Sequence, residues 1–285
     1  MNSIHLSNGL ILAYAEYGDL GGRPVFFFHG IPGSRFFHPP DEITQRMGVR
    51  LICMDRPGYG ESGFQPARRI LDWPGYVTSL ADHLNIGTFS VASHSGGGPY
   101  ALACSYALPE RVRSAAIVSS LGPVGSYEDM QLLIPVNRIA LKFGQHIPWW
   151  LLYLFVRLFF RKRSANPERE LDRGTGHRPL DDDRLLKNNE IRQVCISSEE
   201  EAFRHGLQGL AWDIHLVTGN WGFRLEDIRV PVHIWHGTSD NMASISMARQ
   251  MAAIIPRSSL TVFENEAHLL LFPHWEQILL KLIME

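Results

Sequence analysis

The sequence has little cysteine and no excess of charge of either sign. Its three cysteines, Cys53, Cys104 and Cys195, lie in unrelated segments of a chain of 285 residues and form no CxxC pair. This excludes a disulfide scaffold and a spaced cysteine metal site, and we expect thiols that pack as small apolar side chains. Lys and Arg number 27 against 29 Asp and Glu, giving a net charge of −2. The chain therefore lacks the positive field that attracts nucleic acid.

Long hydrophobic runs are also missing. The most apolar segment, residues 147–160 (IPWWLLYLFVRLFF), has 14 residues and contains Arg157, whereas a spanning helix needs about 20. It predicts a helix that packs in the core or lines an apolar substrate pocket. The alternative is a helix lying on a membrane surface through residues 147–163, with basic residues at its edge. Residues 1–12 lack the basic and apolar regions of a signal peptide, so we expect a cytoplasmic protein.

What the chain does contain is an alternation of short apolar runs and helical patterns. Apolar runs bounded by turn residues indicate strands buried on both faces, as in a parallel sheet. They cover residues 24–28, 49–54, 89–92, 114–118, 231–235 and 260–263, after an N-terminal hairpin at 4–17. Helical patterns cover residues 76–84, 97–107, 244–255 and 268–283. This alternation predicts an α/β fold with right-handed crossovers.

The alternation stops between residues 123 and 222, where helical patterns follow one another without a clear strand. We therefore predict one core built from residues 1–122 and 223–285, interrupted by a helical lid over 123–222. Three features are expected in the lid: a helix opened by Asp181 to Asp183, a second helix running from a capping box at Ser198 and Glu201 toward Val217, and an exposed, mobile loop at 173–179.

Four of the predicted strands end in polar or glycine-rich turns. These turns are HGIPGS at 29–34, DRPGYGES at 55–62, SHSGG at 93–97 and HGTSD at 236–240. In a parallel sheet the carboxyl ends of the strands lie at one edge, and ligands bind outside that edge. The four turns are therefore predicted to gather at one site.

In this order, followed by a histidine at 268, the turns resemble those of the α/β-hydrolase superfamily, and the resemblance covers nearly the whole chain. The sequence is most similar to cap-bearing esterases, proline iminopeptidase-like enzymes and relatives of epoxide hydrolases. The resemblance implies the α/β-hydrolase fold, a mostly parallel central sheet flanked by helices with an inserted helical cap. The sequence contains no HExxH motif, no GxxxxGK(S/T) motif and no spaced Cys/His set, so we expect no metal and no other cofactor.

Ser95 is the candidate nucleophile. It follows a predicted strand and precedes a predicted helix, so a sharp turn would hold its hydroxyl clear of the sheet. A serine needs a base, and the base needs an orienting carboxylate. The resemblance implies His268 as the base and Asp240 as the carboxylate. The chain departs from the family pattern at two positions, because Ser93 and Ala267 stand where glycine is usual.

The resemblance also implies an oxyanion hole formed by the backbone N–H groups of Ile31 and Gly96. Four residues of the same turns are expected to support this arrangement: His29, Gly30, His94 and Gly97. A further charge network, structural rather than catalytic, is expected from Asp55, Arg56 and Glu61.

Aromatic residues of the predicted lid suit an apolar acyl or aryl group. The candidate pocket residues are Trp149, Trp150, Tyr153, Trp212 and Trp221, and Phe155 and Phe159 add further aromatic surface. A serine in place of an aspartate at the elbow argues against epoxide hydrolysis and dehalogenation, and leaves acyl chemistry. The sequence thus predicts a serine hydrolase that cleaves a small or medium carboxylic ester with an apolar group through an acyl-enzyme.

Three other functions stay open. The first is an aminopeptidase like proline iminopeptidase, in which acidic residues at 199–201 would recognise the substrate amine. The second is another acyl or carbon–carbon hydrolase. The third is a non-catalytic receptor for a small ligand, because a fold does not determine a function. In each case the expected partner is a small molecule.

Overall fold

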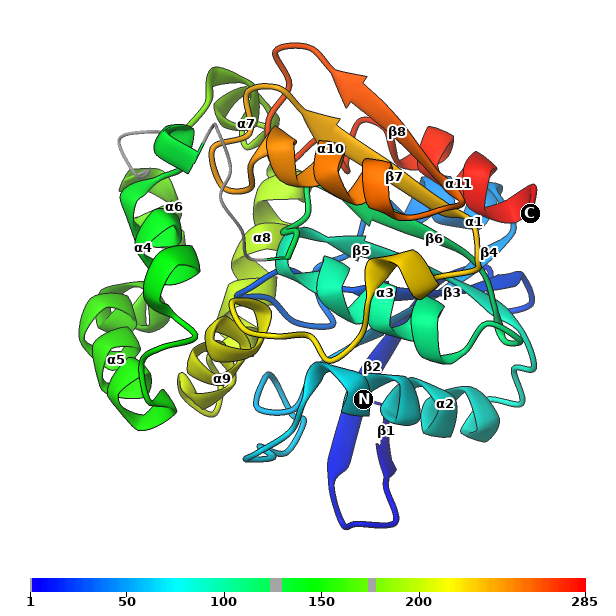
Figure 1. Ribbon diagram of the computed structural model, residues 1–285, viewed down its shortest axis with the longest axis horizontal. Coiled ribbons are helices and arrows are strands. Elements are labelled where there is room, and N and C mark those ends of the chain that lie inside the picture. Colours follow the sequence, from blue (N-terminus) through cyan, green and yellow to red (C-terminus); the bar gives the residue numbers. More distant parts are fainter. Residues whose placement is uncertain (1, 124–129, 174–177) are drawn as a thin grey trace.

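A central sheet organises the molecule, as the computed structural model shows for residues 2–123, 130–173 and 178–285 (Figure 1). The described residues form eight strands in the order β1–β2–β4–β3–β5–β6–β7–β8. The pairs β1–β2 and β2–β4 are antiparallel and the others are parallel. The strands are β1 (Asn2–His5), β2 (Ile11–Gly18), β3 (Arg23–Phe28), β4 (Val49–Met54), β5 (Phe89–His94), β6 (Val112–Val118), β7 (Val232–Gly237) and β8 (Ser258–Phe263). The predicted α/β fold is confirmed.

Helices cover both faces of this sheet. The helices α2 (Trp73–His83), α3 (Gly98–Ala107) and α10 (Ile245–Ile254) pack on one face, and α1 (Asp41–Arg46) and α11 (Trp275–Ile283) pack on the other. Strand β3 shows why its sequence is apolar throughout, because successive side chains point to opposite faces. Phe26 and Phe28 join the cluster under α2 and α3, whereas Val25 and Phe27 join the cluster under α11.

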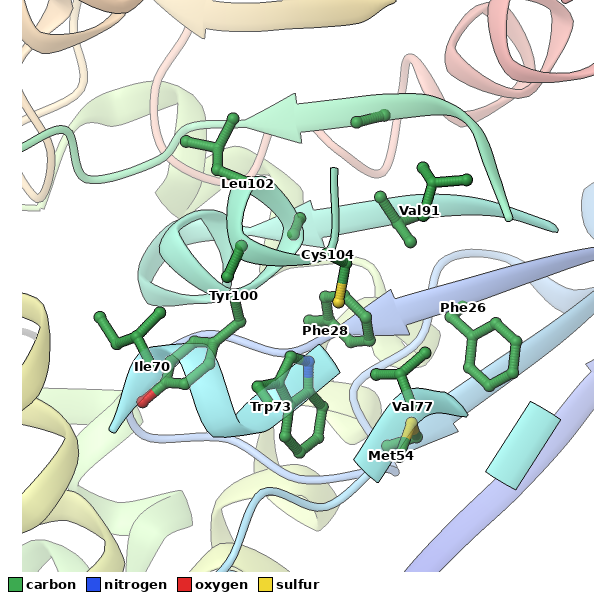
Figure 2. Packing of buried hydrophobic residues seen from close by; sticks show 14 of the residues in the cluster. Phe26, Phe28, Met54, Ile70, Trp73, Val77, Val91, Tyr100, Leu102 and Cys104 are labelled. Carbon is green, nitrogen blue, oxygen red and sulfur yellow. The ribbon is translucent and has the colours of Figure 1, made fainter. Parts of the chain in front are cut away.

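The larger cluster lies between the sheet and helices α2 and α3. Figure 2 shows Phe28 beside Trp73 and Cys104, with Tyr100 nearby, and the Phe28 and Trp73 rings meet edge to face with centroids 5.3 Å apart. Cys104 is fully buried here, and Cys53 is buried in the cluster on the opposite face of the sheet. Both thiols thus pack as small apolar side chains, as the sequence predicts.

A helical insertion follows β6 and precedes β7. Its described helices are α4 (Pro135–Phe143), α5 (Trp149–Ala165), α6 (Pro167–Arg173), α7 (Leu180–Leu185), α8 (Asn189–Ala202) and α9 (Gln208–Val217). In Figure 1, α8 and α9 lie next to the sheet, and α4, α5 and α6 lie farther out. The helix expected at Asp181 to Asp183 is present as α7. The predicted loop at 173–179 falls largely on residues 174–177, which lie outside the described residues.

Two predicted helix starts are wrong. Ser198 and Glu201 lie in the last turns of α8, which begins after Asn188, because the Asn188 side chain accepts hydrogen bonds from the amides of the first turn. The helix expected from His268 begins only at Trp275. The amides of His268 and Leu269 instead donate to the Asp182 carboxylate of α7, which holds this stretch as a turn.

Candidate active site

Ser95 lies in the sharp turn between β5 and α3. Its φ is +55°, in the left-handed region that side chains rarely adopt, and the surrounding structure must hold this strain. Gly97 makes the turn fit, since a Cβ there would lie 2.2 Å from the carbonyl oxygen of Phe28. At the other end, the buried Ser93 takes the usual glycine position and donates from Oγ to the Ala116 carbonyl at 3.3 Å. The turn therefore accommodates this departure from the family pattern.

The turn after β3 packs directly against Ser95. A Cβ on Gly30 would lie 3.2 Å from the Cβ of Ser95, and a Cβ on Gly96 would lie 2.5 Å from Cδ1 of Ile31. Ile31 and Gly96 are therefore neighbours, as an oxyanion hole made from their amides requires. The structure brings this predicted pair together beside the candidate nucleophile.

His268 and Asp240 form a buried pair. Nδ1 of His268 lies 2.8 Å from Oδ2 of Asp240, and Oδ1 of Asp240 accepts the amides of Met242 and Ala243 at 2.8 and 3.0 Å. These amides orient the carboxylate toward the imidazole. Burial lowers the pKa of His268, but the charge and hydrogen bond of Asp240 outweigh burial, so the pKa is raised from its ordinary 6.5.

His94 connects the turn that holds Ser95 to the histidine loop, the stretch between β8 and α11 that contains His268. Its Nε2 lies 2.9 Å from the carbonyl oxygen of His268, and the two rings lie 4.7 Å apart between centroids. Burial, with the nearby charge of His268, lowers the pKa of His94 to about 3. His94 is therefore neutral and donates from Nε2. Among the described residues, no hydrogen bond joins Ser95 to His268.

Arg56 binds the backbone of the turn after β3, which contains Ile31. Its guanidinium donates to the carbonyl oxygens of His29 and Gly30 at 2.6 and 2.7 Å, and to the carboxylate of Asp213 in α9 at 2.7 Å. Nδ1 of His29 lies 2.8 Å from the Gly30 carbonyl oxygen. Burial and the Arg56 charge hold the pKa of His29 well below 6.5, so this ring is neutral.

Sequence reasoning missed Asp213 and its partners. Asp213 is fully buried, binds Arg56 and Arg68, and accepts a hydrogen bond from the Tyr100 hydroxyl at 2.6 Å. Burial raises its pKa, but the two arginines outweigh that effect and hold the pKa below the ordinary value. A single carboxylate within the apolar run LAWDIHLV was the available signal, because a carboxylate in such a position needs a cationic partner.

Arg35 anchors a second buried cluster. Its guanidinium binds Asp55, reaches Glu201 of α8 at 2.7 Å and reaches Glu61 at 3.1 Å. The expected network of Asp55, Arg56 and Glu61 is thus corrected, since Asp55 and Glu61 share Arg35 while Arg56 binds elsewhere. Burial outweighs Arg35 and raises the pKa of Asp55 to about 6.

Asp182 has a role that its predicted place at a helix start does not indicate. Its carboxylate accepts the amides of Leu269 at 2.8 Å and His268 at 3.3 Å. Burial raises its pKa to about 6, with His268 and these amides acting in the opposite direction. The sequence shows three consecutive aspartates at 181–183, and only the packing of α7 selects the middle one. Asp182 thus fixes the backbone of the histidine loop through hydrogen bonds from the insertion.

The predicted aromatic pocket residues divide into three groups. Trp149 and Trp212 meet with ring centroids 5.4 Å apart, and Tyr153 lies 6.3 Å from Trp149. Trp150 is 61% exposed, and the ring contacts of this group do not include it. Trp221 is buried in the cluster between the sheet and α3, because its indole packs beside the core after α9 ends. These positions leave Trp149, Tyr153 and Trp212 as candidates.

The acidic residues at 199–201 are largely occupied by arginines. Glu199 binds Arg163, with one contact at 2.8 Å, and Glu201 binds both Arg35 and Arg204. Glu200 is exposed. This arrangement gives the predicted amine recognition no support.

The sequence model of the family described as the alpha/beta hydrolase fold matches residues 23–274. The match covers most of the chain, and the protein therefore belongs to this family.

Several curated proteins are similar to parts of the chain or to all of it. An acetyltransferase component of the acetoin cleaving system from Pseudomonas putida is 36% identical over 142 residues, 47% of this chain and 37% of that protein. (E)-2-((N-methylformamido)methylene)succinate hydrolase from Acinetobacter baylyi is 24% identical over 273 residues, 94% of this chain and 90% of that protein. A proline iminopeptidase from Lactobacillus helveticus is 32% identical over 39% of this chain and 42% of that protein. The chain thus spans less than half the length of the first and third.

Solved structures share the fold. The enol-lactonase from Burkholderia xenovorans LB400 is similar with a TM-score of 0.66 and 16% identity, over 100% of both chains. At this identity the similarity shows the fold alone.

Proposed function

We propose that the protein is a serine hydrolase that cleaves a small or medium carboxylic ester with an apolar group. The observation that carries the proposal is the strained turn of Ser95 beside the Ile31–Gly96 contact, with the buried His268–Asp240 pair joined to this turn through His94. The name of one relative, a hydrolase similar over 94% of this chain, supports hydrolytic chemistry.

In the proposed reaction, Nε2 of His268 takes the proton of Ser95 while Oγ attacks the carbonyl carbon of the ester. The amides of Ile31 and Gly96 stabilise the oxyanion of the tetrahedral intermediate. The intermediate then breaks its carbon–oxygen bond, and His268 returns the proton to the departing alcohol. Water, deprotonated by His268, releases the acid from the acyl-enzyme in a second cycle. Asp240 stabilises the imidazolium in both cycles.

The insertion, residues 123–222, serves as the cap of this site. Its helix α9 lies against the turn that follows β4, and its aromatic group at Trp149, Tyr153 and Trp212 offers an apolar wall for the acyl or alcohol portion. An apolar wall excludes water and favours apolar substrates over charged ones.

The test compares Ser95→Ala with Ser93→Ala, a control two residues away in the same turn. Wild type and Ser93→Ala are expected to react with a fluorophosphonate probe and to hydrolyse nitrophenyl butyrate or octanoate. Ser95→Ala should lose labelling and turnover while keeping its circular dichroism spectrum. Labelling that survives in Ser95→Ala would reject Ser95 as the nucleophile.

A substrate panel separates the alternatives. We expect nitrophenyl esters to be cleaved faster than proline or alanine anilides, because Glu199 and Glu201 already bind arginines and Glu200 is exposed. Faster anilide cleavage would favour an aminopeptidase. A single slow turnover, with a ligand-induced increase in melting temperature, would favour a receptor.

A further inference from the structure

The outer face of α5 is an apolar surface that the rest of the described chain leaves uncovered. By the outer face of α5 we mean six side chains that are between 40% and 69% exposed: Trp150, Leu151, Leu154, Phe155, Leu158 and Phe159. They recur at helical spacing along one side of a helix of 17 residues. An apolar patch of this kind on a protein surface marks an interaction site.

The opposite side of α5 already satisfies the packing needs of the helix. Leu152 and Val156 are buried in a cluster with Leu207, Leu210 and Ala211 of the α9 region. The outer face therefore neither fills the core nor lines the site beside Ser95. Figure 1 shows α5 at the end of the insertion far from the sheet, where an extended surface can approach it.

The charged residues of α5 indicate what binds this face. Arg157, Arg161 and Lys162 are exposed on the same helix, and α5 contains no acidic residue. Arg163 differs from them because it turns inward to Glu199. The exposed surface of α5 thus combines Trp, Leu and Phe side chains with three cations, the composition of a helix that lies in the plane of an anionic lipid surface.

A second copy of the chain fits this face less well. In a twofold dimer the same patch meets itself, so the three exposed cations of each copy would face those of the other. A lipid surface with anionic headgroups instead neutralises them. The neighbouring helix α4 adds exposed Val136, Ile139 and Phe143 along one of its sides, which extends the apolar character of the insertion.

We propose that the outer face of α5 binds the surface of an anionic lipid bilayer, with its apolar side chains inserted below the headgroups and its three cations at the phosphates. None of the helices in the described ranges is long and apolar enough to cross a membrane. In the proposed contact, α5 lies along the lipid surface. It does not depend on the chemistry of Ser95.

The experiment measures flotation of the full chain with vesicles of phosphatidylcholine, with and without phosphatidylglycerol. We expect binding to the vesicles that contain phosphatidylglycerol and a decrease as salt is raised. The double variant Leu154→Gln/Leu158→Gln should weaken binding by roughly tenfold or more, because inserted leucine side chains are lost. The triple variant Arg157→Gln/Arg161→Gln/Lys162→Gln should weaken it by roughly tenfold or more at low salt.

Matched controls use the same substitutions on the hydrolase core. Leu20→Gln removes an exposed leucine (64% exposed, against 69% for Leu158) from the turn after β2. Arg249→Gln removes an exposed arginine of α10. Both should bind vesicles as the wild type does, and circular dichroism checks that all variants fold.

Three outcomes would overturn the proposal. They are no binding to either vesicle, binding that Leu154→Gln/Leu158→Gln leaves unchanged, and a dimer in sedimentation experiments that this double variant dissociates. The last would assign the face to a second copy. Because vesicle binding is measured without substrate, Ser95→Ala should bind normally, and a failure of the hydrolase proposal would leave this result intact.

Discussion

The pairing of His268 with Asp240 determines how the activity should depend on pH. In the proposed reaction, Nε2 accepts the Ser95 proton only when the imidazole is neutral, and the Asp240 carboxylate raises the pKa of His268 above 6.5. Activity is therefore present above that raised pKa and is lost as the pH falls through it. The acid limb of kcat/KM should lie above the ordinary histidine value rather than below it.

Asp240→Asn tests this assignment. Removing the carboxylate charge should lower the pKa of His268 and shift the acid limb to lower pH, while the misoriented imidazole reduces kcat by roughly 10³- to 10⁴-fold. The measurement is kcat/KM against pH for both proteins, with Asp227→Asn, in an exposed turn, as the control. An acid limb that stays in place in Asp240→Asn would mean that another group orients His268.

Asp182 acts through the backbone of the histidine loop rather than on substrate. Asp182→Ala would leave two buried amides without acceptors, which costs about 1–3 kcal/mol of unfolding free energy. We expect kcat to fall by about tenfold as the loop loosens, and amide exchange at residues 268 and 269 to accelerate. The Asp183 side chain is 48% exposed, so Asp183→Ala should change neither kcat nor amide exchange at residues 268 and 269. Unchanged exchange in Asp182→Ala would reject this positioning role.

At the scale of elements, α9 meets the core through a direct backbone contact. A Cβ on Gly209 would lie 2.4 Å from the carbonyl oxygen of Gly58, and neither backbone can move aside without disturbing the turn after β4. The close approach places Asp213, one helical turn later, within reach of Arg56. Docking of the helix and formation of the buried ion pair therefore depend on each other.

Gly209→Ala tests this dependence. The added methyl group should push α9 outward and cost about 1–3 kcal/mol by overpacking, with faster proteolysis of the insertion. Gly75→Ala in α2 is the matched control, because a Cβ there meets nothing within 4 Å and should stabilise the helix by up to about 1 kcal/mol. If both variants had the same stability, the backbone contact would not limit docking.

At the scale of the whole molecule, the sequence predicts the sheet better than the insertion. Strands buried on both faces, such as β3 and β5, carry continuous apolar runs between turn residues. Ser95 follows β5, Asp240 follows β7 and His268 comes after β8, all at the carboxyl ends of parallel strands. The short helix α1 carries no comparable pattern. In the insertion, Ser198 looked like a helix cap because its spacing to Glu201 fits a capping box, yet its hydroxyl instead accepts the amide of Ser34 from the core at 3.0 Å.

The same limit explains the missed carboxylates. Asp182, Glu201 and Asp213 each have a partner in the core that is at least 86 residues away along the chain, and a local sequence pattern carries no information on such pairs. Each of them joins the insertion to the core. The contact between the two parts of the molecule is thus buried and ionic as well as apolar, and it can be recognised only once the packing is known.

These buried pairs predict that core and insertion unfold together. Asp213 is fully buried between Arg56 and Arg68. Separating the insertion from the core would therefore expose these charges or leave them without partners, and removal of one partner of a buried pair costs about 3–5 kcal/mol. We expect a single urea transition for the wild type, with coincident curves from circular dichroism and from proteolysis of the insertion. In Asp213→Asn, which leaves two buried arginines without their carboxylate, proteolysis should begin at lower urea than the loss of sheet structure. Separate transitions in the wild type would show that these ion pairs do not couple the insertion to the core.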